Sequence, residues 1–195
     1  LVSTDNAFTH YFAVCRKLGV NLLSAVKQKQ FVFINGLSAP YSWTESVTVE
    51  GSHPEMYSAS NTNIFTLPKE GHPLKELYNT IVKSLSTEGP FCILVDNIST
   101  LNNGLMAISE LLDFLNYCDN LVRQREGSCL IVLAHSDSSD GVLLQTLRHR
   151  ADLMMEVTGL SSGKTIYTDG ELFLRAKEAS LTLPRLHYKL GDNDV

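Results

Sequence analysis

Residues 159–165 read GLSSGKT, and the final Gly-Lys-Thr resembles the end of a phosphate-binding loop. In such a loop, backbone amides and the lysine hold phosphates while the hydroxyl residue meets magnesium. The spacing is one residue short of that motif, and a working loop must join a strand to the N-terminus of a helix. The flanking segments, LMMEV and TIYT, are both typical of strands. We therefore expect an ordinary turn here, with Lys164 pointing into solvent.

The same segment also fits G-x-S-x-G, the nucleophile elbow of α/β-hydrolases. Ser161 would be the nucleophile, exposed by a sharp turn between a strand and a helix. Because strand-like segments flank the motif on both sides, it lacks the context that the elbow requires. We expect no hydrolase chemistry from Ser161.

Asp96 follows the apolar run FCILV at residues 91–95. An apolar strand that ends in an acid is the form taken by the magnesium-holding strand of phosphate-loop ATPases. Many buried parallel strands also end in a polar residue, so descent from an ATPase strand and a plain strand end both stay open. A magnesium ligand needs a phosphate loop beside it, and the sequence shows none. We therefore predict no bound cofactor and no metal.

A second polar group, His135 and Asp137, follows the apolar run CLIVLA at residues 129–134. Ligands of open α/β sheets bind at this edge, although a polar strand end followed by a turn is the plainer interpretation. Two arginine pairs are predicted at helix C-termini, where their positive charges either interact favourably with the helix dipole or contact phosphate. These pairs are Arg123 with Arg125, and Arg148 with Arg150.

Three apolar runs, FVFI (31–34), FCILV and CLIVLA, predict strands of a parallel sheet that is covered on both faces. Helical spacing of apolar residues predicts the helices between them. These helices are expected over 8–18 with a stop at Gly19, from Pro73 to Leu85, over 105–122 and over 142–147. After residue 150 the pattern changes to short strand-like runs, with a hairpin turn at Asp169-Gly170. We expect an antiparallel meander that closes the sheet.

The chain has 195 residues, of which 44% are hydrophobic and 19% charged, and its formal net charge is −5. This length predicts a single domain over residues 1–195, and the acidic balance argues against a dedicated nucleic-acid module. Cys92 and Cys129 lie in apolar runs and are expected to be buried, reduced thiols. With neither a membrane span nor a signal peptide in view, we expect a cytoplasmic protein that is also possible in the nucleus. Residues 36–72 form one long irregular stretch rich in Ser, Thr and Asn, and we expect a long loop insertion there.

The order strand, helix, strand with a terminal acid, helix, strand, helix and antiparallel tail resembles the RecA-like ATPase core, entered after its first strand and helix. Several dispersed segments are more specifically similar to the sixth-subunit family of the Elongator complex. They are HYFAVCRKLGVNL, QFVFINGL, FCILVDNIS, LLDFLNYC and the strand end VLAHSD. The predicted fold class is therefore α/β, a RecA-like three-layer core with a mainly parallel central sheet and a C-terminal antiparallel meander.

The resemblance implies a non-catalytic subunit that joins the fourth and fifth Elongator subunits in a hetero-hexameric ring. That ring would assist the Elongator catalytic core in modifying the wobble uridine of transfer RNA, which would bind across a composite ring surface. It also implies that Asp96 is a relic of the magnesium strand and that the loop from His135 to Gly141 faces RNA. The RNA-facing residues we expect are His135, Ser136, Ser138, Ser139, Arg123, Arg125, Arg148 and Arg150.

The chain begins at Leu1, and a true phosphate loop would precede that residue in a RecA-like protein. The alternative is therefore an active RecA-like ATPase whose phosphate-binding loop lies before Leu1. A G-x-x-x-x-G-K-[ST] motif opening a helix in that position would favour catalysis.

Overall fold

A computed structural model describes residues 1–36, 73–85, 88–102, 106–136, 141–161, 163, 165–177 and 185–191. Residues 37–72, which make up nearly all of the predicted insertion, lie outside this set. The chain divides into two compact units, residues 1–140 and 141–195, and each is described by itself. The single domain expected from the length stays a prediction.

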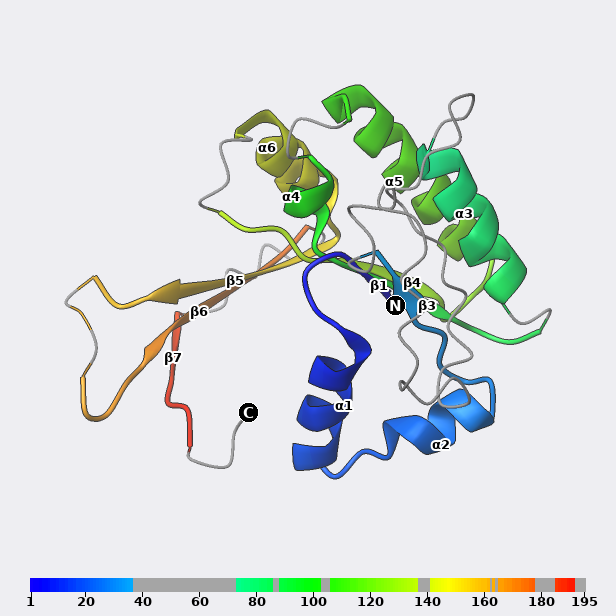
Figure 1. Cartoon of the computed structure of the whole chain (residues 1–195). Helices are drawn as coiled ribbons and strands as arrows, with labels where there is room; N and C mark the ends of the chain where they lie inside the picture. Colours follow the sequence, from blue (N-terminus) through cyan, green and yellow to red (C-terminus); the bar gives the residue numbers. More distant parts are fainter. Residues whose placement is uncertain are drawn as a thin grey trace, which may run out of the picture. The chain divides into compact units, whose positions relative to one another are not determined.

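The first unit contains a four-stranded parallel sheet, seen near the centre of Figure 1. Its strands are β1 (Val2–Ser3), β2 (Ile34–Asn35), β3 (Cys92–Asp96) and β4 (Cys129–Val132), in the order β2-β1-β3-β4. Val2 pairs with both Ile34 and Val95, so the short β1 is a central strand. The carboxyl ends of β1 and β3 therefore lie next to each other, with Ser3 beside Asp96.

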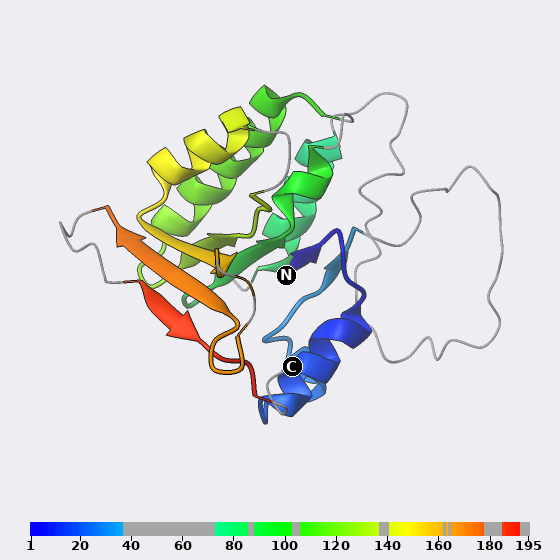
Figure 2. The same cartoon turned by 90° about the vertical axis from the view of Figure 1, so that its left-hand side faces the viewer.

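Helices lie on the two sides of this sheet in separate pairs (Figures 1 and 2). On one face lie α3 (Pro73–Ser84) and α5 (Ile108–Arg123), which contact each other, and α5 also contacts β3 and β4. On the other side lie α1 (Phe8–Lys17) and α2 (Leu22–Lys27). The short α4 (Ile98–Leu101) directly follows β3.

Local sequence explains where these helices begin and end. Leu18 caps α1 and Gly19 follows it at φ 76°, a left-handed conformation that glycine adopts at little cost, so the predicted stop is confirmed. Pro73 is the first residue of α3, as predicted. Proline has no backbone N–H, and at this position the helix loses nothing, because an N–H in the first turn has no acceptor within the helix. The core on the side of α1 and α2 includes Phe8 of α1, Leu22 of α2 and Phe33. The rings of Phe8 and Phe33 meet edge to face with centroids 5.5 Å apart.

The second unit begins with α6 (Gly141–Arg150) and continues into a sheet of its own. Its strands β5 (Leu153–Gly159), β6 (Gly170–Ala176) and β7 (Leu186–Tyr188) are antiparallel and pair in that order. The predicted meander is confirmed, but the expectation that it closes the parallel sheet is wrong, because the two sheets share no strand pairing in the described residues.

The hairpin between β5 and β6 also differs from the prediction in its turn. Residues 165–168 were expected to be strand, yet the connection runs from Leu160 to Asp169 and Thr168 N–H donates to Thr165 Oγ1 within it. Gly159 ends β5 and Gly170 begins β6, so the GLSSGKT segment leads from strand to strand. The predicted context is confirmed, while Lys164 and Ser162 themselves lie outside the described residues.

Two expectations about the parallel strands were wrong. The run at 31–34 contributes to β2 only through Ile34, because Phe31 N–H still donates to Ala25 O at the end of α2. The strands are also not covered on both faces, since Ile131 is 49% exposed. Cys92 and Cys129, expected to be buried, are exposed as well, because α1 and α2 pack over the β1 and β2 side of that face.

Candidate functional site

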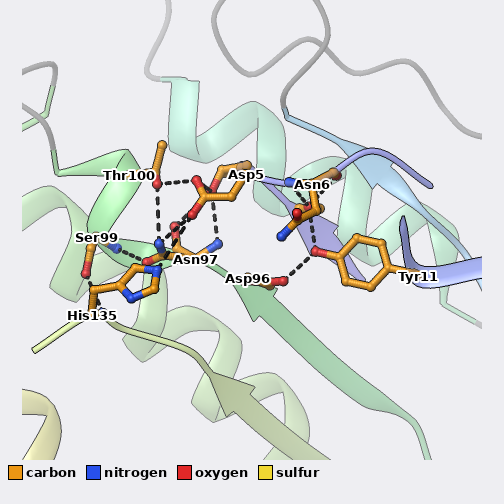
Figure 3. A network of polar contacts seen from close by, with 10 residues as sticks. Asp5, Asn6, Tyr11, Asp96, Asn97, Ser99, Thr100 and His135 are labelled. Atoms are coloured by element: carbon orange, nitrogen blue, oxygen red, sulfur yellow. Dashed lines mark hydrogen bonds and ion pairs between the residues drawn. The ribbon is translucent and has the colours of Figure 1, made fainter. Parts of the chain in front are cut away.

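Asp96 ends β3 at the edge of the sheet formed by the carboxyl ends of the strands, which is where open α/β sheets bind ligands. The residue is 9% exposed, and its carboxylate accepts a hydrogen bond from the hydroxyl of Tyr11 on α1. The Ser3 hydroxyl lies 2.7 Å from the same tyrosine oxygen. Burial and the hydrogen bond to Asp96 raise the pKa of Tyr11 to about 12. The phenol therefore stays protonated and keeps donating to the buried acid (Figure 3).

Asp5, in the loop after β1, is the second acid at this edge. Its carboxylate accepts from Asn97 Nδ2 at 2.7 Å and from the hydroxyl of Thr100. Both donors belong to the segment that follows β3, so the contact joins two loops that are 92 residues apart in sequence. Figure 3 shows Asp5 close to Thr100 and Asn97, with His135 on the same side of it.

Asn97 connects the strand end to the short helix. It is 1% exposed, and its side-chain oxygen accepts from Ser99 N–H at 2.8 Å, which caps the N-terminus of α4. Its backbone exchanges two hydrogen bonds with the Thr4 hydroxyl, each 2.9 Å long. All buried polar side-chain atoms in the described residues have a partner. The edge is thus fixed by hydrogen bonds within the chain.

His135 lies beyond the end of β4 at the same edge, as predicted from its position after an apolar run. Its Nε2 is 3.9 Å from Asp5 Oδ2, and its backbone N–H donates to Ser99 Oγ at 3.0 Å. The imidazole is 58% exposed, and the adjacent Ser136 is exposed too. Asp137, Ser138 and Ser139 lie outside the described residues.

This arrangement gives the edge a net acidic character. Asp5 lies beside the His135 imidazole and Asp96 meets the phenol of Tyr11, and the donors to the two carboxylates are neutral hydroxyl and amide groups. A carboxylate whose acceptor positions are occupied by its own chain is a structural group, and it attracts phosphate poorly. Among the described residues, no three His, Cys, Asp or Glu side chains are grouped as a metal ion would require.

The predicted arginines lie at or just beyond the C-terminal ends of α5 and α6. Arg125 stacks over the ring of Phe91 at 5.2 Å, next to the start of β3 and so at the opposite edge of the sheet from Asp96. Arg123 forms an ion pair with Asp119 at 2.8 Å within α5. Arg148 and Arg150 end α6 in the second unit, where Arg148 pairs with Glu156 of β5 at 3.1 Å. Arg123 and Arg125 therefore belong to the same unit as His135, with Arg125 at the strand-start edge, whereas Arg148 and Arg150 belong to the second unit.

Sequence reasoning missed Asp5, Tyr11, Asn97 and Thr100. The two-residue strand β1 has no apolar run to reveal it, so the loop that carries Asp5 was not placed at the edge. The polar run TDN at residues 4–6, just after the short apolar start, was the available signal. Tyr11 fits the apolar spacing of the helix predicted over 8–18, and that spacing does not single out its hydroxyl.

Comparison with known proteins gives the chain a family. The family profile described as "Elongation complex protein 6" matches residues 1–192. The chain belongs to this family. Curated relatives named Elongator complex protein 6 include that of Xenopus tropicalis, 31% identical over 212 residues, covering 100% of this chain and 76% of the relative. The Homo sapiens relative is 28% identical over 213 residues, with 100% and 76% covered.

Solved structures place this Elongator complex protein 6 family member in a known fold. An uncharacterized Pyrococcus horikoshii protein, solved in complex with an unknown peptide, has a TM-score of 0.52 at 11% identity and covers 99% of this chain and 76% of its own. A KaiC-like protein from the same archaeon has a TM-score of 0.51 at 10% identity, with 98% and 72% covered. The predicted RecA-like α/β class is confirmed. No helix in the described part of the chain is long and apolar enough to cross a membrane.

Proposed function

We propose that this chain is a non-catalytic, RecA-like subunit of the Elongator complex. In this proposal it joins the fourth and fifth subunits in a hexameric accessory ring, in the cytoplasm and also in the nucleus. The ring supports transfer RNA binding while the catalytic core modifies the wobble uridine. The family match over residues 1–192 and the KaiC-like fold support membership and architecture. The observation that carries the non-catalytic role is the hydrogen bond from Tyr11 to Asp96.

That hydrogen bond matters because of what a magnesium-strand acid must do. In a phosphate-loop ATPase the acid helps to hold the ion that bridges the nucleotide phosphates, so its oxygens must face the nucleotide. Here the corresponding acid is 9% exposed and points to the phenol of α1. The segment that most resembles a phosphate loop joins β5 to β6, and so provides no helix N-terminus for an anion.

Charge supports a shared RNA surface instead of one carried by this chain alone. The net charge is −5, and the strand-end edge is acidic. The exposed His135 and Ser136 offer few positive charges, so long-range attraction of RNA phosphates must come from neighbouring subunits. Arg123 and Arg148 hold exposed ion pairs, which are worth only about 0–1 kcal/mol, so phosphate can compete for them.

A salt series tests the shared surface. Transfer RNA binding is measured for the isolated chain and for the ring reconstituted with the fourth and fifth subunits. We expect weak binding by the chain alone and a steeper salt dependence for the ring, since each neutralised phosphate adds about −0.9 to the log–log slope on duplex. Equal affinity and equal slope in the two samples would place the whole site on this chain and contradict the proposal.

Calorimetric titration with ATP and magnesium tests the catalytic alternative. We expect no micromolar binding by the chain, either as wild type or as Asp96→Asn. If the protein, including any sequence that precedes Leu1, bound ATP tightly and Asp96→Asn abolished that binding, the active ATPase would replace the proposal. Tyr11→Phe is the matched variant, because it frees the Asp96 carboxylate and leaves the acid in place.

A further inference from the structure

One face of β3 and β4 is apolar yet open to solvent in the first unit. Residues at alternate positions of a strand share a face, so Cys92 and Leu94 lie together on β3, and Cys129 and Ile131 on β4. On the opposite face Ile93 is 4% exposed and Val95 is fully buried. On the open face Ile131 is 49% exposed, and the next residue of that face, Leu133, is 47% exposed.

The two cysteines of this face are direct partners across the sheet. Cys92 pairs with Cys129 in the parallel register of β3 and β4, so the two side chains lie beside each other on one face of the sheet. Neighbouring strands lie about 4.7–4.9 Å apart, which falls within the Cα separation of about 4.4–6.8 Å found in disulfides. A disulfide requires the two Cβ atoms to lie about 3.8 Å apart. β4 can move closer to Cys92 by a small shift, because it pairs only with β3 among the described strands.

Both thiols are free and exposed, which distinguishes them from the other two cysteines of the chain. Cys118 is fully buried on α5, and Cys15 is half-buried on α1. Cys92 also lines a hollow of about 760 Å³ at the strand-start edge, together with Gln28 and Gln30. A small reagent can therefore reach the pair from solvent.

We propose that Cys92 and Cys129 form a reversible dithiol–disulfide site, oxidised by a low-molecular-weight disulfide such as oxidised glutathione. The two strands are held in register by the sheet, so the second thiol is in place before the first one reacts. The oxidised site bridges β3 and β4 on the open face. The reduced site leaves β4 held by its backbone hydrogen bonds to β3 and by its packing against α5.

The exchange proceeds in two balanced steps. The thiolate of Cys129 attacks one sulfur of oxidised glutathione, forming a mixed disulfide and releasing one glutathione thiolate, which takes up a proton. The thiolate of Cys92 then attacks the Cys129 sulfur, forming the internal disulfide and releasing the second glutathione. The cysteine pair loses two electrons and two protons, and glutathione disulfide gains them.

The surroundings of Cys92 set its resting state. Partial loss of water around the sulfur and the neighbouring Cys129 raise the pKa of the Cys92 thiol to about 11, although the nearby Leu1 ammonium acts in the opposite direction. Most molecules therefore carry a protonated Cys92 thiol at neutral pH. Because the thiolate is the attacking nucleophile, the internal disulfide forms slowly at neutral pH. The cysteine pair therefore stays reduced unless an oxidant is present.

The experiment incubates the 195-residue chain with oxidised glutathione, blocks the remaining thiols under unfolding conditions and maps the peptides by mass spectrometry. We expect wild type to lose the Cys92 and Cys129 thiols together, with the two peptides joined, and dithiothreitol to restore both. Cys92→Ser leaves glutathione attached to Cys129 with no internal link. Cys15→Ser is the matched control and gives the same joined peptides as wild type.

Two outcomes would overturn the proposal. One is glutathione on Cys92 and Cys129 separately in wild type, with no joined peptide. The other is a joined peptide that includes Cys15 or Cys118, which would show oxidation of partly unfolded chains. Circular dichroism of each variant before oxidation verifies that the folded protein is the species tested.

Discussion

At the edge of the parallel sheet, the hydroxyl of Tyr11 determines what the acid of β3 can do. It donates to the Asp96 carboxylate, and Ser3 lies 2.7 Å from the same oxygen. Removing it by Tyr11→Phe leaves a buried carboxylate short of a donor, which costs about 1–3 kcal/mol. We expect urea denaturation to show a loss of that size in the free energy of unfolding.

Tyr78→Phe is the matched control for that measurement. It removes a hydroxyl from another helix of the same unit and keeps the ring contact with Tyr117, whose centroid is 5.7 Å away. We expect a change within about 0.5 kcal/mol. Equal losses in the two variants would mean that the hydrogen bond from Tyr11 to Asp96 contributes nothing particular to stability.

At the scale of elements, the β5–β6 hairpin depends on one glycine of a register pair. A Cβ added at Gly170 would lie 2.6 Å from the Thr158 carbonyl oxygen and 2.5 Å from the Tyr188 hydroxyl. Because the carbonyl belongs to the backbone, the strand itself must shift to make room. We expect Gly170→Ala to cost about 1–3 kcal/mol in thermal or urea unfolding.

The opposing glycine supplies the control. Gly159 pairs with Gly170, and a Cβ added there meets nothing within 4 Å. Gly159→Ala should be neutral or slightly stabilising, since glycine in a strand costs more conformational entropy than alanine. If Gly159→Ala destabilises as much as Gly170→Ala, the close approach of Tyr188 and Thr158 is not the cause.

For the whole molecule, alkaline pH should weaken folding. The pKa of Tyr11 is raised from 10.0 to about 12, and burial raises the pKa of Cys118 from 9.0 to about 12. Both groups hold their protons more tightly in the folded chain than in the unfolded one. Their contribution is therefore complete below about pH 9 and is lost as pH rises towards about 12.

The test is the slope of the free energy of unfolding against pH between about 9 and 12. Cys118→Val removes one titrating group of similar size, so we expect a shallower decline than in wild type. Leu115→Val, which changes packing on the same helix without removing a titrating group, should lower stability and keep the wild-type slope. Parallel curves for wild type and Cys118→Val would contradict the linkage.

Local signals in the sequence were sufficient for the long elements. Apolar spacing and terminal residues predicted α1, α3 and α5, and the apolar run that ends at Asp96 predicted β3. The strand before GLSSGKT was predicted correctly and the segment does lead to another strand, although TIYT itself belongs to the connection. These predictions succeed because helix periodicity and strand hydrophobicity act over neighbouring residues.

Tertiary structure decided the pairings between distant segments. The two residues of β1 have no periodicity of their own, and they form a strand because Val2 is held between Ile34 and Val95. That placement brings Asp5 to Asn97, and it sets Tyr11 on Asp96 across 85 residues of sequence. The exposure of Cys92 and Cys129 was likewise decided by which part of the face the first two helices cover. Hydrogen-bond partners and burial at this range depend on the packed arrangement of the elements, which no local pattern encodes.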